Sequence, residues 1–200
     1  MGKRATPKKA TVRGGVLARL TAEEARGVLE SLLRNHPELK QEAVEIAKSS
    51  LADVSYEDVA AEVEDLLKSL SHQDMAGRCG RQLWGYVEPT EAAWELLEET
   101  IEPLVNDVKR LIETGLIRAA AETSKGLLLG LYLVRSDVAS GDVLDCAPDF
   151  ATETACAVLA TWRRGKKRKK SVEASFTGFA REHLPEWVDM VSRALSSERQ

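Results

Sequence analysis

Apolar residues recur every three or four positions along most of this chain. That spacing places them on one face of an α-helix. Seven windows show the pattern: about 21–35, 39–51, 55–70, 90–114, 116–135, 149–164 and 173–197. The last window is interrupted at Pro185, so it holds one or two helices. The sequence therefore predicts an all-α fold, either an irregular helical bundle or an α-solenoid-like array, of about seven to eight helices.

Several of these windows begin at a capping signal. Thr21 followed by Glu24 matches the capping box, and Ser55 followed by Asp58 is a second start signal. Thr90 stands where we expect it to cap the long helix that follows. The sequence therefore predicts where three of the helices begin.

Prolines and one glycine set the expected ends. His36 precedes Pro37 and should end the first helix, because a residue before proline is pushed out of the helical region. Pro103 should kink or divide the long helix, since it lacks a backbone donor. Gly115 is a suitable C-terminal cap.

The window 116–135 is apolar on nearly all sides from Leu127 to Val134. A helix of this kind is usually buried on most sides, so we place it at the centre of the fold. Gly126 and Gly130 lie one turn apart and would let a second helix approach closely. Two stretches, 71–89 and 136–148, lack helical spacing and are predicted to be loops, the first with at most one helical turn.

Two segments resemble known helical proteins. Leu111, Ile112, Gly115 and residues 119–121 resemble the helix–turn–helix of tetratricopeptide or HEAT-type repeats, and residues 85–99, GYVEPTEAAWELLEE, resemble uncharacterised bacterial all-helical proteins. The resemblance spans residues 85–135. It implies a helical-repeat-like arrangement and no active site, so no residue role follows from it.

Composition agrees with this fold class. Hydrophobic residues make up 44% of the 200 residues and aromatic residues only 5%, while Ala, Leu and Glu, which lose little freedom in a helix, are plentiful. The three cysteines form no CxxC pair, which is typical of a reducing compartment. The polar N-terminus is no secretory signal, and no apolar run approaches the roughly 20 residues that span a bilayer. We expect a cytoplasmic protein, or a nuclear one in a eukaryote, without membrane contacts.

Charge is distributed unevenly. The formal net charge is −4, but residues 1–15 and 163–170 hold 12 of the 28 cations and no acid. The remaining 16 cations face 32 acids, a balance of −16, which repels nucleic acid and anionic membranes. We expect residues 1–15 to be a disordered basic arm and residues 16–200 to be a single helical domain with a basic inter-helix run at 163–171.

No motif for catalysis, metal binding or cofactor binding is present, so we expect no metal and no cofactor. The three histidines are not at ligand spacing, and the glycines of 77–85 form neither GxGxxG nor a Walker A loop. Cys79, between Arg78 and Arg81, is the best candidate for a reactive thiol, because nearby cations favour the thiolate. The alternative is a free cysteine whose neighbouring arginines pair with the acidic helix next to it.

The segment 78–86 combines residue types that dominate protein interfaces. The candidates for partner binding are Arg78, Arg81, Trp84 and Tyr86. Two interpretations stay open: a binding loop, or a plug in which Trp84 and Tyr86 close the end of the bundle. The acidic face of residues 91–102 likewise either binds a basic partner or is a solvated face.

The run RRGKKRKK is the strongest single signal. Its candidates for phosphate contact are Arg163, Arg164, Lys166, Lys167, Arg168, Lys169 and Lys170. The run binds nucleic-acid phosphate nonspecifically, or acts as a nuclear address, or is a solvated linker that docks on the protein's own acidic face.

We therefore predict a non-catalytic protein-interaction or adaptor module with a protein partner. The first alternative is a nucleic-acid-associated protein that makes nonspecific phosphate contacts through residues 3–13 and 163–170. The second is a thiol-dependent enzyme or redox sensor that uses Cys79.

Overall fold

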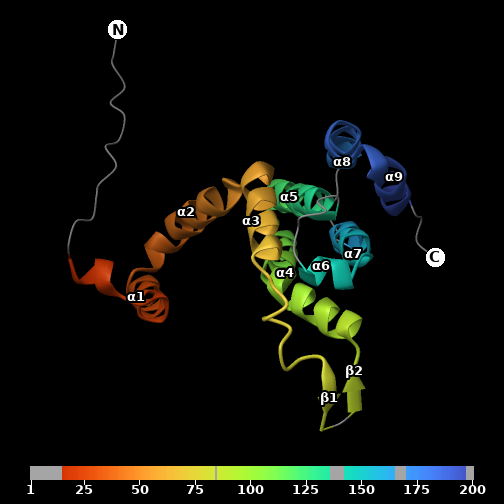
Figure 1. The fold of residues 1–200 in the computed structure, drawn as a ribbon. Helices are drawn as coiled ribbons and strands as arrows, with labels where there is room; N and C mark the ends of the chain where they lie inside the picture. Colours follow the sequence, from red (N-terminus) through yellow and green to blue (C-terminus); the bar gives the residue numbers. More distant parts are fainter. Residues whose placement is uncertain (1–14, 84, 136–141, 165–169, 197–200) are drawn as a thin grey trace. The chain divides into compact units, whose positions relative to one another are not determined.

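The computed structural model describes residues 15–83, 85–135, 142–164 and 170–196. Over these residues it contains nine α-helices, eight of them of at least seven residues, and one two-stranded hairpin (Figure 1). The all-α prediction is confirmed. The chain forms two compact units, Met1–Ala47 and Lys48–Gln200, which are described separately. The single domain over residues 16–200 stays a prediction, and residues 1–14 of the predicted basic arm lie outside the described residues.

The first unit contains a 3-10 turn (Val16–Arg19), helix α1 (Ala22–Asn35), a second 3-10 turn (Pro37–Leu39) and the start of α2 (Lys40–Ala52). The predicted capping box is present. The Glu24 amide donates to the Thr21 hydroxyl at 3.3 Å, and the Thr21 amide donates to Oε2 of Glu24 at 2.8 Å. As predicted, α1 ends just before His36.

The apolar stripe of α1 is exposed. Val28, Leu29 and Leu32 retain 47, 49 and 45% of their accessible surface, and no residue of α1 or α2 is buried. Helices of 13 or 14 residues are marginal alone. The first unit therefore depends mainly on local caps and turns among its described residues.

The second unit is built around α5. Its bounds are α3 (Tyr56–Lys68), α4 (Pro89–Glu113), α5 (Ile117–Arg135), α6 (Asp142–Cys146), α7 (Phe150–Arg164), α8 (Lys170–His183) and α9 (Val188–Ser196). Helix α5 packs against α3, α4, α7 and α8, and most of its side chains are buried. The sequence-based prediction of a central helix at 116–135 is confirmed.

Two glycines of α5 allow α3 to pack closely, as predicted. A Cβ atom on Gly126 would stand 2.5 Å from Val59 Cβ, and one on Gly130 would stand 2.6 Å from Val63 Cβ. The carbonyls of Tyr56 and Ala60 would lie at 2.7 and 2.8 Å from the same two positions. These separations are shorter than contacts between carbon or oxygen atoms allow, so only glycine fits at either site.

The long helix departs from the prediction at its start, and of the two alternatives for Pro103, a kink or a division, the division does not occur. It begins at Pro89 with Glu88 as the N-cap, so Thr90 is not the cap. It also runs without division through Pro103. Pro103 is exposed and the neighbouring Ile101 is buried, so the proline lies on the solvent side of the helix.

The predicted cap at Gly115 is confirmed and has the geometry of a Schellman motif. Gly115 has φ +79°, its amide donates to the Ile112 carbonyl at 3.0 Å, and the Leu116 amide donates to the Leu111 carbonyl at 2.9 Å.

The prediction of loops at 71–89 and 136–148 was wrong in part. The first contains an antiparallel hairpin, β1 (Gly80–Gln82) and β2 (Gly85–Val87), and the second contains α6. Strands of three residues are too short to show an alternating pattern. The available signal for the hairpin is instead its two glycines, because Gly80 and Gly85 have φ of +88° and +152°, in a region that favours glycine.

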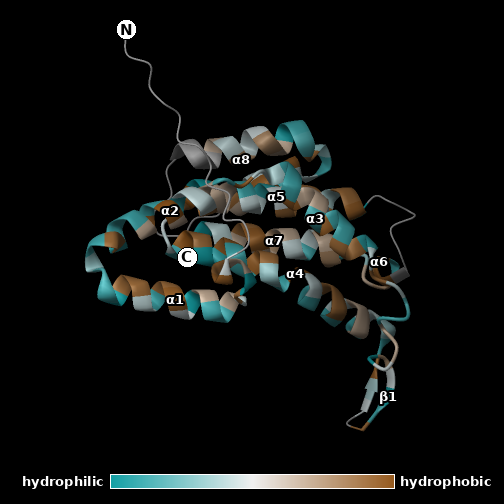
Figure 2. Cartoon of the chain, turned by 90° about the vertical axis from the view of Figure 1, so that its left-hand side faces the viewer, coloured by the Kyte–Doolittle hydropathy of each residue, from teal (hydrophilic) through white to brown (hydrophobic). Residues whose placement is uncertain are grey.

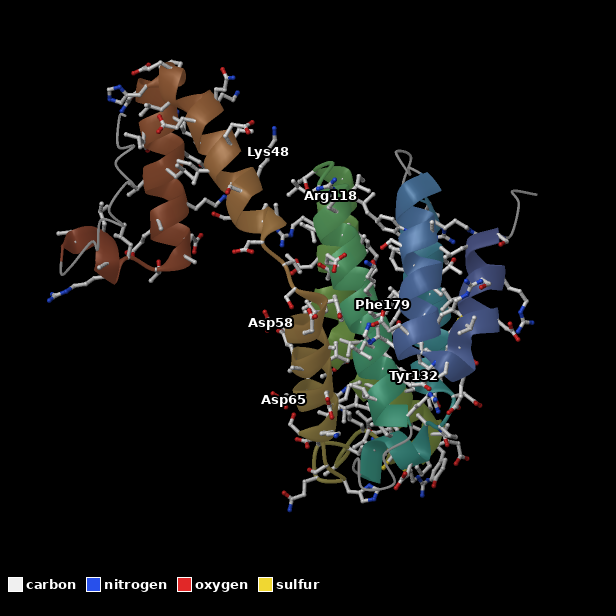
Figure 3. The ribbon with its side chains drawn as sticks, turned by 90° about the horizontal axis from the view of Figure 1, so that it is seen from above. Lys48, Asp58, Asp65, Arg118, Tyr132 and Phe179 are labelled. Atoms are coloured by element: carbon white, nitrogen blue, oxygen red, sulfur yellow. The ribbon has the colours of Figure 1, made fainter. Side chains whose placement is uncertain are left out.

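Aromatic side chains attach α8 and α9 to the rest of the second unit. Figure 3 shows Phe179 between α5 and α8. Its ring meets Tyr56 of α3 edge-on at 5.1 Å, and Nζ of the buried Lys125 lies 5.7 Å from the same ring. Directly before α9, the ring of Trp187 meets Tyr132 of α5 edge-on at 5.3 Å, and the Arg135 guanidinium lies 5.6 Å from the Trp187 ring. Ring and cation–π contacts of this kind each add about 0.5–1.5 kcal/mol beyond burial.

Gly126→Ala should lower the free energy of unfolding by about 1–3 kcal/mol, because its Cβ overpacks the contact with α3. The matched control is Gly178→Ala, since Gly178 lies inside α8 and no other atom stands near the place that its Cβ would take. Helix propensity alone should make that variant up to about 1 kcal/mol more stable. Urea unfolding followed by circular dichroism measures both. Equal changes in the two variants would contradict the close contact.

Candidate interaction surface

The hairpin β1–β2 projects from the helices of the second unit, as Figures 1 and 2 show. Arg81 pairs with Tyr86 across the two strands, and the Gln82 side-chain amide donates to the Gly77 carbonyl at 2.8 Å. Leu83 is fully exposed and Tyr86 is 65% exposed. The hairpin therefore presents two large apolar side chains to solvent, Leu83 in its turn and Tyr86 on β2.

The structure decides between the two interpretations of segment 78–86, binding loop or plug, for one of its residues. Tyr86 does not plug the end of the bundle, because most of its side chain is exposed. Arg81 is also exposed, while Arg78 and Cys79 are half-buried. Trp84 lies outside the described residues, so its role as a plug or as a contact stays a prediction.

Arg78 joins the base of the hairpin segment to α4. Its guanidinium lies 2.9 Å from Oε2 of Glu99. The hydrogen bond to Arg78 and then its charge lower the pKa of Glu99, and the same hydrogen bond raises the pKa of Arg78. At this position an arginine does pair with the neighbouring acidic helix, as one interpretation of the segment expected.

A groove of about 660 Å³ runs between α4 and α7. Trp94 and Val105 on α4 are half-buried, and Ala157 on α7 is exposed, so apolar surface lies along its floor. The rings of Trp94 and Phe150 meet edge-on at 5.3 Å and tie the two helices together at one end. We call this the α4–α7 groove.

Carboxylates surround this apolar floor. The five that line the groove are Glu95, Glu98, Glu99, Glu102 and Glu153. Lys109 lines it as well, and Arg78 reaches it through Glu99, so five acids stand against two cations. Within the described residues, Glu95, Glu98, Glu102 and Glu153 form no ion pair. The groove therefore has a strong negative potential over an apolar surface.

Cys79 is half-buried next to Arg78, and its role as a reactive thiol stays a prediction. Its Sγ donates to the Met75 carbonyl at 3.9 Å, and the adjacent Arg78 is engaged with Glu99. Among the described residues, no three histidine, cysteine or acidic side chains gather as a group that could hold a metal ion.

The basic run begins at the end of α7. Arg163 is half-buried and donates to the Ala194 carbonyl of α9 at 3.3 Å. With Arg193 it lines a second groove of about 450 Å³ between α7 and α9. Arg164 is exposed at the helix end, and Lys170 begins α8. The candidates Lys166, Lys167, Arg168 and Lys169 lie outside the described residues.

Sequence reasoning missed Leu83 and the α4–α7 groove. Leu83 lies between Gly80 and Gly85, whose spacing was the available signal for a tight turn that exposes it. Glu153 and Ala157 were not identified because only the packing of α7 against α4 brings them to the acidic face of residues 91–102.

The chain was compared with known protein families, curated proteins and solved structures, and none matches. The resemblance to helical-repeat proteins therefore stays a prediction. None of the described helices has the length and apolar character needed to cross a membrane.

Arg78→Gln should raise the pKa of Glu99 toward that of an ordinary carboxyl group, because it removes the guanidinium that hydrogen-bonds to the carboxylate and stabilises it by its charge. In the wild type, the stabilisation from this pair exists above the unfolded-state pKa and is lost as the pH falls through the lower folded-state pKa. Titration of the Glu99 side chain by carbon NMR measures the change. Arg81→Gln is the control and should leave Glu99 unaltered; an unchanged Glu99 in Arg78→Gln would refute the pair.

Proposed function

We propose that this protein is a non-catalytic protein-interaction module that binds its partner through the hairpin β1–β2. The observation that carries the proposal is the exposure of Leu83 in the turn of the hairpin and of Tyr86 on β2. Single exposed apolar residues are ordinary, but two large ones together with Arg81 on a projecting hairpin form the chemistry of an interface hot spot.

The shape of the hairpin supports this role. A two-stranded hairpin of three-residue strands has little stability of its own, and no other strand among the described residues pairs with either of its edges. Arg78 and Gln82 hold its base through Glu99 and the Gly77 carbonyl. A short, anchored hairpin can present the tip in one conformation, which lowers the entropy lost on binding.

A protein partner suits the charge better than nucleic acid does at this surface. Glu95, Glu98 and Glu102 stand on the helix that follows the hairpin, and like charges there repel phosphate. The partner surface expected at the hairpin is therefore apolar with acidic or neutral groups for Arg81 and cationic groups toward α4.

Leu83→Ser combined with Tyr86→Ser should abolish recovery of the partner in an affinity purification, because it removes the apolar contact area of the hairpin. The melting temperature should stay within about 2 °C of the wild type, since both side chains are exposed and surface changes are usually within 0.5 kcal/mol. Leu133→Ser, on an exposed position of α5, is the control and should retain the partner. Undiminished binding of the purified partner by the double variant would reject the proposal.

A second candidate function is nonspecific contact with nucleic-acid phosphate through the basic run. It is favoured by Arg163 and Arg193, which lie together on the groove between α7 and α9, next to the cations of residues 166–170 in the sequence. Such contacts would be salt-dependent, because each neutralised phosphate releases a counterion.

The variant in which glutamine replaces the four cations at 166–169 should bind duplex DNA with a weaker salt dependence. The slope of the logarithm of its binding constant against the logarithm of the salt concentration should be reduced by about 3 to 4. Filter binding at salt concentrations from about 50 to about 200 mM measures the slope, because phosphate contacts weaken strongly over this range. The matched control removes four cations elsewhere: Arg34, Lys40, Lys109 and Arg118. An equal loss in both variants would indicate only an effect of net charge, and no binding at low salt would remove the candidate.

A further inference from the structure

We infer that the α4–α7 groove binds a basic, amphipathic α-helix of a partner protein. The inference rests on the proposed interaction function and adds the chemistry of the partner. It concerns a surface separate from the hairpin tip, so the two can be tested independently.

The groove has the shape of a helix-binding site. Its α4 wall runs from Trp94 to Lys109, which is about 22 Å of helix and equals about four turns of a ligand helix. Two packed helices form the walls, and Trp94, Val105 and Ala157 provide apolar surface between them. Helices that dock in such grooves insert apolar side chains at i, i+3, i+4 and i+7.

Charge complementarity identifies this occupant. Glu95, Glu98 and Glu102 follow one face of α4 at spacings of three and four residues, and Glu153 faces the groove from α7. Lysines or arginines that flank an apolar stripe on a ligand helix would lie beside these carboxylates. Nucleic acid and anionic lipid are repelled by the same groups.

An acidic surface alone would bind any polycation, whereas this groove requires an ordered apolar stripe as well. The distinguishing features are the apolar floor and the ring pair of Trp94 and Phe150 that ties the walls together at one end. A flexible polyamine or a scrambled basic peptide would reach the carboxylates but not fill the floor.

The experiment uses the full-length protein and three fluorescein-labelled synthetic peptides, each about four helical turns long. The first has Lys and Leu in amphipathic order, the second has the same residues in scrambled order, and the third has Glu in place of Lys. In fluorescence anisotropy the first should bind at least about tenfold more tightly than the second, and the third should not bind. Equal binding of the first two, or equally effective displacement by spermine, would overturn the inference.

Variants of the protein locate the binding site. Ala157→Tyr places a large side chain in the groove at an exposed position and should weaken binding at least about tenfold, whereas Thr152→Tyr on the same helix should not. Glu95→Gln with Glu102→Gln should weaken it by about three- to tenfold. The control pair Glu62→Gln with Glu113→Gln makes the same change in net charge outside the groove. Equal losses from both pairs would show diffuse attraction and reject the site.

The hairpin variant separates this inference from the proposed function. Leu83→Ser with Tyr86→Ser should bind the amphipathic peptide as the wild type does. If the peptide does not bind the protein but the hairpin variant loses its partner, the groove inference fails and the proposed function stands. If the peptide binds and the hairpin variant keeps its partner, the groove inference stands and the proposed function fails.

Discussion

The close contact between α3 and α5 determines how the second unit is arranged. Val59 and Val63 of α3 occupy the space that side chains at Gly126 and Gly130 would otherwise fill. With α3 on one side of α5, α4 and α7 pack on its other faces, and their mutual contact forms the α4–α7 groove. The segment from α3 to α4 must then connect two helices fixed on the same core, and it is this segment that contains the hairpin.

The local signals in the sequence were sufficient for most helices because each depends on neighbouring residues. Thr21 with Glu24, and Ser55 with Asp58, act over three positions, and the cap at Gly115 follows from one left-handed residue. Gly126 and Gly130 also predicted a close helix contact, although their partner, α3, could not be identified. Thr90 failed because Pro89 is itself favoured in the first turn of a helix and moved the start forward.

The candidate surfaces were less predictable because they depend on contacts between distant segments. Arg78, Arg81 and Tyr86 were identified from residue type, but the exposure of Leu83 follows from the turn between two three-residue strands. The acidic face of residues 91–102 was visible in the sequence, yet neither its groove nor Glu153 was. Periodicity shows which residues share a face of one helix, and it contains no information on which other helix covers that face.

Arg78 makes the two surfaces interdependent. Its guanidinium anchors the hairpin segment by pairing with Glu99, which also lines the α4–α7 groove. A cationic side chain bound in the groove would compete with Arg78 for that carboxylate, so the anchor would weaken whenever the groove is occupied as inferred. Coupling between two binding sites is reciprocal. A partner that holds Arg78 on Glu99 when it binds the hairpin must therefore lower the affinity of the groove for a basic helix. The factor is the same as that by which a helix in the groove lowers the affinity of the hairpin for this partner. Because Glu99 is exposed, that factor is small, and the groove carboxylates without an ion pair within the described residues, Glu95, Glu98, Glu102 and Glu153, carry most of the attraction.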